Sequence, residues 1–290
     1  MTGIKNPIIP GNKEIAYRDP ACIFWDGRYI LLMTLSRKKD GFMYNTVAIS
    51  ESCDLKAWSE PRSITEEDCQ KNYCSPGSII KMGDEFLIAV SSYPMPIPYS
   101  ERGYADNTAR LFFIRTKDFK SFSEPQIIMA KGDTPPDMLG RMIDPFVFKD
   151  KDKENLYHLF FKQNGVSHSY SHDLMKWTYD GSYDAGENAC VIIKDGLYYL
   201  IHSPENGIGL KTSEDLKVWC DKGVNTLSQG EWDFAGGRLT AAFAMEAPKD
   251  IGYEYIVFFH GSRKGAIPET HGEASIGVAF TNDFSEYFYS

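Results

Sequence analysis

Short apolar runs recur along the whole chain, and each follows a polar turn. The runs are rich in β-branched and aromatic residues, which is typical of buried strands. Asp26-Gly27 and Asp195-Gly196 stand directly before two of the runs, and such pairs between apolar segments indicate hairpins. The runs begin near Tyr29, Phe86, Leu156, Leu197 and Tyr253. This pattern predicts an all-β protein, and no segment predicts a helix.

Before each run stands an opening segment that combines a proline or small residue with a polar or acidic one. Proline has a fixed φ and no N–H to donate, so it suits the first residue of a strand. The openings are Asp19-Pro20, Ser75-Pro76, Asp144-Pro145, Glu187-Asn188-Ala189 and Glu246-Ala247-Pro248. Four of these five openings therefore place a carboxylate where a strand begins.

Each unit closes with the pattern Ser/Thr-x-Asp-Leu/Phe-x-x-aromatic. Its polar side chains can bond nearby backbone groups and start a turn, while its apolar residues pack beneath the next unit. The pattern begins at Ser52, Thr116, Ser171, Ser213 and Thr281. Five copies in 290 residues give units of roughly 58 residues. We therefore predict a five-bladed β-propeller forming a single domain over residues 1–290, with all five openings at one end of its axis.

Composition and charge limit the partners of such a propeller. The formal net charge of −9 argues against a nucleic-acid partner. No apolar run is long enough to cross a bilayer, so no membrane partner is expected. The first residues lack the apolar core of a signal peptide, so we expect a cytoplasmic protein, or a periplasmic or secreted one if a leader was removed. The six cysteines show no metal-ligand spacing and are expected to be reduced thiols.

Several carboxylates that converge in one channel repel one another, which drives their pKa values apart. This arrangement suits glycoside hydrolysis, where one carboxylic acid protonates the leaving oxygen and one carboxylate activates water. A third acid nearby can orient the sugar and tune the first. Taken alone, an Asp-Pro step marks a turn, but its recurrence at one end of several repeats favours a functional role. We therefore expect an oligosaccharide or polysaccharide substrate.

The segments Asn6-Pro7-Ile8-Ile9-Pro10-Gly11, Arg18-Asp19-Pro20 and Ile143-Asp144-Pro145 resemble glycoside hydrolase family 43. That family lies within the superfamily of five-bladed propeller glycosidases, with families 32, 62, 68, 117 and 130. The resemblance implies that Asp19 is the general base and that Asp144 tunes the acid. It also implies an inverting mechanism on arabinose- or xylose-containing glycans, and galactose-containing glycans are included here as candidates.

Two glutamates compete for the role of general acid in this resemblance. The family's acid opens a Glu-Gly-Pro-type motif that runs into a Gly-Tyr-Tyr-Tyr-Leu-like strand. Glu187 stands at the same offset before Gly196-Leu197-Tyr198-Tyr199-Leu200, although the Gly and Pro of the motif are replaced. Glu246 keeps the proline but belongs to the fifth unit. We favour Glu187 as the acid and assign Glu246 to substrate binding.

Other side chains near the openings are candidates for substrate binding. Arg18 and Arg141 flank the two aspartates and could hold a sugar hydroxyl or form structural ion pairs. Trp25 and Tyr73 could provide a stacking wall for a sugar. His202 and His260 follow the second apolar runs of units four and five, where each could bind substrate or form a structural hydrogen bond; we assign His260 to substrate binding.

Two other functions fit the same fold. A phosphorolytic enzyme would need a basic phosphate pocket, for which Arg18, Arg141, Arg238 and Arg263 are the candidates. A non-catalytic carbohydrate-binding propeller is the alternative outside enzymes. No cofactor is required for acid/base hydrolysis. A structural Ca²⁺ in the channel is compatible with the fold, but no metal site is indicated by ligand spacing. The sugar, the linkage and the choice between terminal and internal cleavage are left open.

Overall fold

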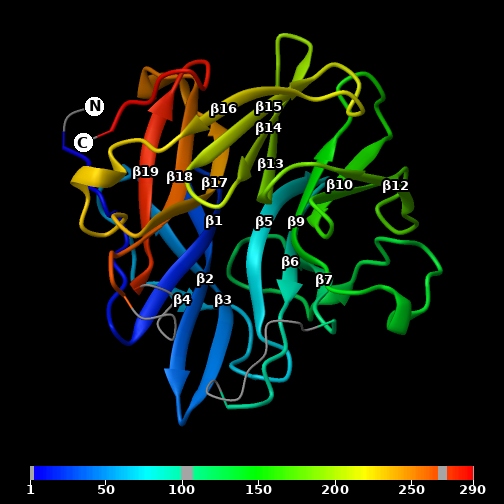
Figure 1. Ribbon diagram of the computed structural model, residues 1–290, viewed down its shortest axis with the longest axis horizontal. Helices are drawn as coiled ribbons and strands as arrows, with labels where there is room; N and C mark the ends of the chain where they lie inside the picture. Colours follow the sequence, from blue (N-terminus) through cyan, green and yellow to red (C-terminus); the bar gives the residue numbers. More distant parts are fainter. Residues whose placement is uncertain (1–2, 99–106, 267–272, 290) are drawn as a thin grey trace.

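The computed structural model describes residues 3–98, 107–266 and 273–289, and within them the chain forms five antiparallel sheets around one axis (Figure 1). The first sheet contains β1 (Ile15–Trp25), β2 (Arg28–Lys39), β3 (Phe42–Ser52) and β4 (Arg62–Ser63). The second contains β5 (Tyr73–Met82), β6 (Glu85–Ser92), β7 (Arg110–Thr116) and β8 (Gln126–Ile127). The third contains β9 (Ile143–Lys149), β10 (Tyr157–Lys162), β11 (Val166–Ser171) and β12 (Thr178–Tyr183). The last two are β13 (Glu187–Lys194), β14 (Leu197–Ser203), β15 (Ile208–Ser213) and β16 (Cys220–Asn225); and β17 (Arg238–Glu246), β18 (Tyr255–Ser262) and β19 (Ser275–Thr281). The prediction of an all-β, five-bladed propeller is confirmed.

The second strand of each blade forms the centre of the core. In β2 the four residues from Ile30 to Met33 are fully buried, and in β18 Phe258 and Phe259 are fully buried as well. Both faces of these strands pack against neighbouring blades, which explains why the sequence shows continuous apolar runs there instead of strict alternation. Only short 3-10 turns interrupt the strands among the described residues, at Pro136–Met138, Gln229–Glu231 and Lys249–Ile251. No helix in the described part of the chain has the length and hydropathy of a membrane span.

The innermost strand of every blade carries a β-bulge with a residue of positive φ at its centre. The register between first and second strands shifts in all five blades at these residues. A bulge bends the strand and re-aims one side chain, and here it does so at equivalent positions around the axis. The bulge residues and their φ angles are Asp19 (51°), Ser75 (47°), Asp144 (54°), Asn188 (52°) and Ala241 (52°).

A bulge takes its central N–H out of the strand ladder, and in four blades a side chain of the preceding blade accepts it. His260 Nδ1 accepts the N–H of Asp19 at 3.1 Å, and Ser91 Oγ accepts the N–H of Asp144 at 2.8 Å. The other two such bonds run from Ser75 N to Thr34 Oγ1 at 2.7 Å and from Ala241 N to Ser203 Oγ at 2.7 Å. All four acceptors lie in the second half of the second strand of a blade. These bonds therefore satisfy buried backbone donors and join successive blades at the same time.

The ring closes where the start of the chain meets the fifth blade. Ile9 forms a β-bridge with Ile276, and the amide of Asn6 bonds both backbone groups of Val278, at 2.9 Å and 2.8 Å. Figure 1 shows the two chain ends beside β19. The fifth sheet has three strands of its own, so this segment covers an edge that would otherwise be open.

The closing pattern forms the same turn in each blade, as predicted. In the first copy Ser52 Oγ accepts the N–H of Leu55 at 2.9 Å, and Asp54 Oδ1 accepts the N–H groups of Lys56 and Ala57 at 2.9 Å each. Leu55 has a φ of 65° and is fully buried, so the turn aims its side chain inward. The bond to the Ser or Thr hydroxyl recurs at Phe119, Leu174, Leu216 and Phe284.

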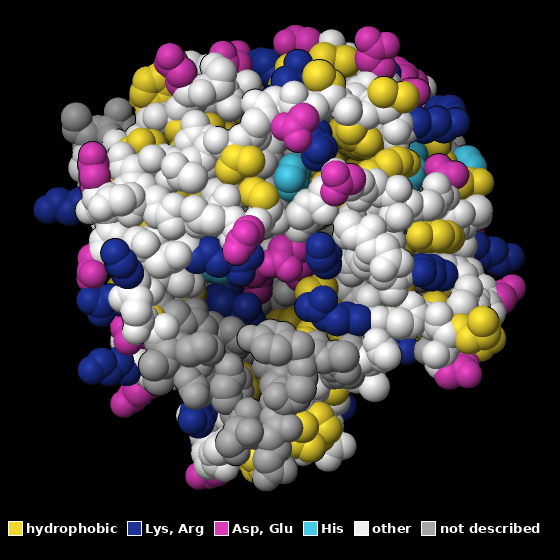
Figure 2. Space-filling model, in the orientation of Figure 1, with side chains coloured by type: hydrophobic (Ala, Val, Ile, Leu, Met, Phe, Trp, Pro, Cys, Tyr) yellow, Lys and Arg dark blue, Asp and Glu magenta, His cyan; other side chains and the backbone are white. Residues whose placement is uncertain are grey.

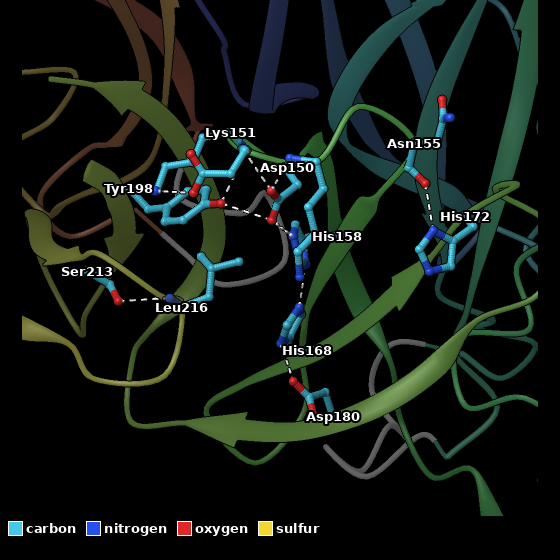
Figure 3. A network of polar contacts seen from close by, with 12 residues as sticks. Asp150, Lys151, Asn155, His158, His168, His172, Asp180, Tyr198, Ser213 and Leu216 are labelled. Carbon is cyan, nitrogen blue, oxygen red and sulfur yellow. Dashed lines mark hydrogen bonds and ion pairs between the residues drawn. The ribbon is translucent and has the colours of Figure 1, made fainter. Parts of the chain in front are cut away.

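A separate chain of buried hydrogen bonds crosses the third blade (Figure 3). His158 contacts Asp150 Oδ2 through Nε2 at 2.8 Å and His168 through Nδ1 at 2.9 Å. His168 then contacts the hydroxyl of Tyr183 at 3.1 Å, and Tyr198 from the fourth blade donates to Asp150 at 3.1 Å. With both imidazoles neutral, His158 donates to Asp150 and His168 donates to His158, while each ring accepts one bond through its other nitrogen. All four ring nitrogens therefore have a hydrogen-bond partner.

Candidate active site

All five bulge residues line one small cavity at the axis of the propeller. Its volume is about 20 Å³, which leaves room for about one water molecule. Blades one to three supply the polar side chains of Asp19, Ser75 and Asp144, whereas Ala189 and Ala241 line the side of blades four and five. Figure 2 shows Asp and Glu side chains gathered near the middle of this face, with Lys and Arg side chains beside them.

Asp19 is buried, with 6% of its surface exposed, and several groups stabilise its carboxylate. Burial acts to raise the pKa of Asp19, but the charge of Arg18 and the hydroxyl donors outweigh it, so the pKa lies below its ordinary value. Thr34 Oγ1 donates to Asp19 Oδ2 at 2.8 Å and Ser75 Oγ donates to the same oxygen at 3.3 Å. Asp19 therefore carries an ionised carboxylate at neutral pH, and it lines the cavity.

Asp144 occupies the equivalent bulge position on β9, but its pKa is shifted in the direction opposite to that of Asp19. The pKa of Asp144 is raised to about 7, first by burial and then by the nearby charges of Glu187 and Asp19. Ser75 and Arg141 act in the opposite direction and lower it by less. A carboxyl group with this pKa holds a proton near neutrality. Two equivalent bulges thus present to the same cavity one carboxyl group with a lowered pKa and one with a raised pKa, which is the separation of pKa values expected for acid/base work.

Glu187 lies at the mouth of the fourth blade, one residue before the bulge. Its side chain is 30% exposed, and its Oε1 is 3.0 Å from Arg238 Nη2. The influence of its charge on the pKa of Asp144 shows that the two carboxyl groups are close. The structure therefore brings Asp19, Asp144 and Glu187 together, although the three lie far apart in the sequence.

The two arginines beside the aspartates stay near the site. Arg18 Nη2 is 4.0 Å from Asp19 Oδ2, with 21% of its side chain exposed. Arg141 stands over the ring of Tyr93 at 5.2 Å, and its charge acts on the pKa of Asp144. Both remain candidates for binding a sugar hydroxyl.

His260 lies beneath Asp19, outside the cavity lining. It is 5% exposed, and its Nδ1 accepts the N–H of Asp19, which requires a neutral ring. Burial lowers the pKa of His260 to about 3, in agreement with that requirement. In this structure His260 holds the backbone of Asp19, and its predicted contact with substrate stays a prediction. His202 is one position out of register with it and accepts the N–H of Gly186 at 3.0 Å.

Glu246 stands apart from the cavity. It is the exposed last residue of β17 and pairs with Tyr255, whereas the bulge of that strand is at Ala241. The prediction that Glu246 stands at the opening of the fifth unit is wrong, and its assignment to substrate binding stays a prediction. The prediction of the opening relied on Pro248, but that proline precedes the 3-10 turn Lys249–Ile251 and does not begin a strand. The opening of the fifth blade has alanines in place of an acid and a proline.

Trp25 and Tyr73 belong to the core between the first two blades. Trp25 is the last residue of β1, and its ring lies 5.5 Å from the rings of Phe86 and Phe119. Tyr73 is near the opening of β5, but its side chain is 8% exposed and packs edge-on against Phe112 at 5.3 Å. Neither ring lines the axial cavity, and the stacking wall for a sugar stays a prediction.

The four arginines considered for phosphate binding do not form one basic pocket among the described residues. Arg263 is exposed and pairs with Asp233 and Glu273, while Arg238 is engaged by Glu187. Within the described ranges, no group of three or more His, Cys, Asp and Glu side chains is arranged to hold a metal ion.

Thr34 is the contributor to the site that sequence patterns missed. It lies at the end of an apolar run, where its hydroxyl looks like one more strand residue. The available signal was a polar residue recurring in the second half of the second strand in several units, at Thr34, Ser91, Ser203 and His260. Only the histidine stood out by residue type.

Fold and site together define a five-bladed β-propeller with an acidic axial pocket. Neither a family model nor a curated protein matches the sequence. Among solved structures, the chain is similar to an exo-1,5-α-L-arabinanase from a bovine ruminal metagenomic library, with 13% identity, 97% of this chain and 99% of that chain covered, and a TM-score of 0.65. It is also similar to a thermostable family-43 glycoside hydrolase, with 18% identity, 99% and 95% coverage and a TM-score of 0.64.

A third similar structure is a family-43 enzyme from Xanthomonas citri complexed with xylotriose, with 14% identity, 93% and 88% coverage and a TM-score of 0.63. At these identities the likeness concerns the fold. The resemblance to family 43 that the motifs indicated is thus matched by the architecture of the whole chain.

Proposed function

We propose that this protein is an inverting glycoside hydrolase acting on an arabinose-, xylose- or galactose-containing glycan. The observation that carries the proposal is that Asp19 and Asp144 line one axial cavity with Glu187 beside them, where the pKa of Asp19 is lowered and that of Asp144 is raised to about 7. Its similarity in fold to an arabinanase and to an enzyme complexed with xylotriose supports this class of substrate.

Asp19 acts as the general base in this proposal. Its ionised carboxylate accepts a proton from a water molecule that attacks the anomeric carbon, and the axial cavity has room for about one water. Burial beside hydroxyl donors keeps the carboxylate in place without neutralising it. In an inverting enzyme the base and acid carboxyl groups are roughly 6.5–9.5 Å apart, which leaves space for that water.

Glu187 acts as the general acid and Asp144 as its modulator. Glu187 is more exposed than the two aspartates, so it can meet a leaving-group oxygen that enters from solvent, and Arg238 orients it. Asp144 holds a proton near neutrality and adds little negative charge to the cluster below pH 7. Its ionisation at higher pH would put a further negative charge between the base and the acid.

The test is hydrolysis of aryl arabinosides, xylosides and galactosides, with the anomer of the released sugar followed by ¹H NMR. Asp19→Asn should lower kcat by about 10²–10⁴-fold on every substrate. Glu187→Gln should do so only for poor leaving groups, because an activated aryl group departs without protonation. Glu246→Gln, a matched acid outside the cavity, should change kcat less than twofold. Binding without turnover would favour a carbohydrate-binding propeller, and turnover that requires phosphate would favour phosphorolysis.

A further inference from the structure

Two hydroxyl groups from different blades converge on one oxygen of Asp19. Thr34, near the middle of β2, is fully buried and donates to Asp19 Oδ2 at 2.8 Å. Ser75, the bulge residue of β5, is 8% exposed and donates to the same oxygen at 3.3 Å. The Asp19 carboxylate is therefore held from the junction between the first and second blades.

The direction of these hydrogen bonds is fixed by a backbone group. Thr34 Oγ1 also accepts the N–H of Ser75 at 2.7 Å. A hydroxyl has one proton to donate, and the amide N–H can only donate, so the proton of Thr34 must point to Asp19. The bulge at Ser75 thereby orients the Thr34 hydroxyl as a donor. A protonated Asp19 would have to find another acceptor for its own proton.

We propose that Thr34 and Ser75 are positioning residues that keep Asp19 ionised and turn its Oδ1 toward the reacting water. This inference rests on the proposed role of Asp19 as the general base. Both hydroxyls occupy Oδ2, and no hydrogen bond within the described residues engages Oδ1. Asp19 lines the axial cavity, so Oδ1 is the oxygen left to accept a proton there.

Among the other groups that face Asp19, the charge of Arg18 lowers the pKa of Asp19 more than either hydroxyl does, but Arg18 donates no hydrogen bond that would fix the direction of the carboxylate. Arg18 is 4.0 Å away and partly exposed to solvent, and His260 is neutral because its Nδ1 accepts a backbone N–H. The buried thiol of Cys74, next to Ser75, has a pKa raised to about 12 by burial, so it contributes no charge. Asp144 across the cavity disfavours a second negative charge.

Asp144 provides an internal comparison. It has the same bulge geometry, and Ser91 accepts its N–H just as Thr34 accepts that of Ser75. Burial nevertheless raises the pKa of Asp144 to about 7, whereas the pKa of Asp19 lies below its ordinary value. The difference between the two carboxyl groups follows from what surrounds each of them: the Ser75 hydroxyl lowers the pKa of both, whereas the Thr34 hydroxyl acts on Asp19 alone.

The inference is tested with Thr34→Val, which keeps the shape of the side chain and removes the hydroxyl. Thr34→Ser is the conservative control, and Ser75→Ala removes the weaker donor without leaving a backbone N–H unpaired. Protein labelled with ¹³C at aspartate carboxyl groups is titrated by NMR, with the Asp19 signal assigned from Asp19→Asn. The pH profile of kcat/KM is measured in parallel. Circular dichroism checks that each variant folds.

We expect the Asp19 titration midpoint to move upward in Thr34→Val and, less, in Ser75→Ala, and to stay unchanged in Thr34→Ser. The acidic side of the pH profile of kcat/KM should shift to higher pH together with the Asp19 midpoint. At pH values below this midpoint, kcat/KM of the variant should therefore be about tenfold lower. Unchanged midpoints in folded Thr34→Val and Ser75→Ala would overturn the inference. A shifted midpoint in a protein that hydrolyses no glycan would support the hydroxyl arrangement and refute the proposed function, so the two failures are distinguishable.

Discussion

Arg238 Nη2 lies 3.0 Å from Glu187 Oε1, and this ion pair joins the mouths of the fourth and fifth blades. Arg238 is also anchored through Nε, which donates to the carbonyl oxygen of Glu205 at 2.9 Å. The guanidinium is thus fixed from two sides before it meets the carboxylate. An arginine held in this way sets the direction of its partner as well as its charge environment.

We predict that Arg238→Met lowers kcat/KM for glycan hydrolysis by about 10–100-fold, because Glu187 loses the group that orients it. Steady-state kinetics on an aryl glycoside with a poor leaving group gives the measurement. Arg263→Met removes an exposed arginine whose partners are Asp233 and Glu273, so it serves as the control and should change kcat/KM less than twofold. Equal losses in both variants would contradict an orienting role.

Asp144 should make the protein less stable at high pH. Its pKa of about 7 lies above the ordinary value of 3.8, so the folded state binds the proton more tightly than the unfolded state. The stabilisation from this proton is complete below pH 3.8 and is lost as pH rises through about 7. Asp144→Asn carries no such charge, so we expect its Tm to exceed that of the unchanged protein by roughly 3–6 °C at pH 8.

The same Tm comparison at pH 4 should show little or no gain for Asp144→Asn, because Asp144 is then protonated in the folded protein. Asp250→Asn alters an exposed aspartate in a 3-10 turn and should shift Tm equally at both pH values. A gain at pH 8 together with lost activity would mark Asp144 as a residue kept for function at a cost in stability. A Tm difference independent of pH would contradict the raised pKa.

The blade count was predictable because each blade repeats the same local signals. The Ser/Thr-x-Asp turn is decided within a few residues, and its hydrogen bonds at Ser52 and Asp54 depend on no other blade. The strand openings at Asp19 and Asp144 were predictable for a similar reason, since a proline follows each of these residues, whereas the bulges there became known only from the structure. Local chemistry at these points agrees with the global fold.

The rest of the site depends on contacts between blades, which no local pattern reports. The bulge at Ala241 has neither proline nor acid, so Glu246 was placed at the fifth opening in its stead. Trp25 has the residue type of a sugar platform, but the direction of its side chain is set by packing against Phe86. Thr34 reaches Asp19 only because its hydroxyl is oriented by the next blade.

The histidine chain of the third blade should make the protein sensitive to acid. Burial lowers the pKa of His168 to about 3 from an ordinary value of 6.5, so the unfolded state binds a proton that the folded state resists. The full stability is present above pH 6.5 and is lost as pH falls toward about 3. His168→Gln cannot titrate, so its free energy of unfolding should fall by about 1–2 kcal/mol less than that of the unchanged protein between pH 6.5 and 5.

Urea denaturation at pH 7, 6 and 5 measures this difference, and a lower overall stability of His168→Gln at pH 7 is expected because its bonds to His158 and Tyr183 are disturbed. His172→Gln is the matched control. His172 is exposed and bonds only the carbonyl oxygen of Asn155 in Figure 3, so its replacement should leave the pH dependence unchanged. The same pH dependence in His168→Gln and the unchanged protein would show that the network is not what responds to acid.

Ala241 and Ala242 offer a test of backbone strain at the bulges. Both line the axial cavity, but only Ala241 has a positive φ, of 52°. A residue with a Cβ pays roughly 1–2 kcal/mol for this conformation, and glycine adopts it without that penalty. Glycine also increases the entropy of the unfolded chain, which opposes the gain at both positions.

We therefore expect Ala241→Gly to change the free energy of unfolding by less than about 0.5 kcal/mol, and Ala242→Gly to lower it by about 1–1.5 kcal/mol. Chemical denaturation of the two variants under one set of conditions gives the comparison directly. Since both substitutions remove one buried methyl group, the difference between them isolates the conformational penalty at the bulge. Equal destabilisation would mean that the bulge at Ala241 relaxes in solution. The fifth blade would then lack the bulge conformation that the other four blades share.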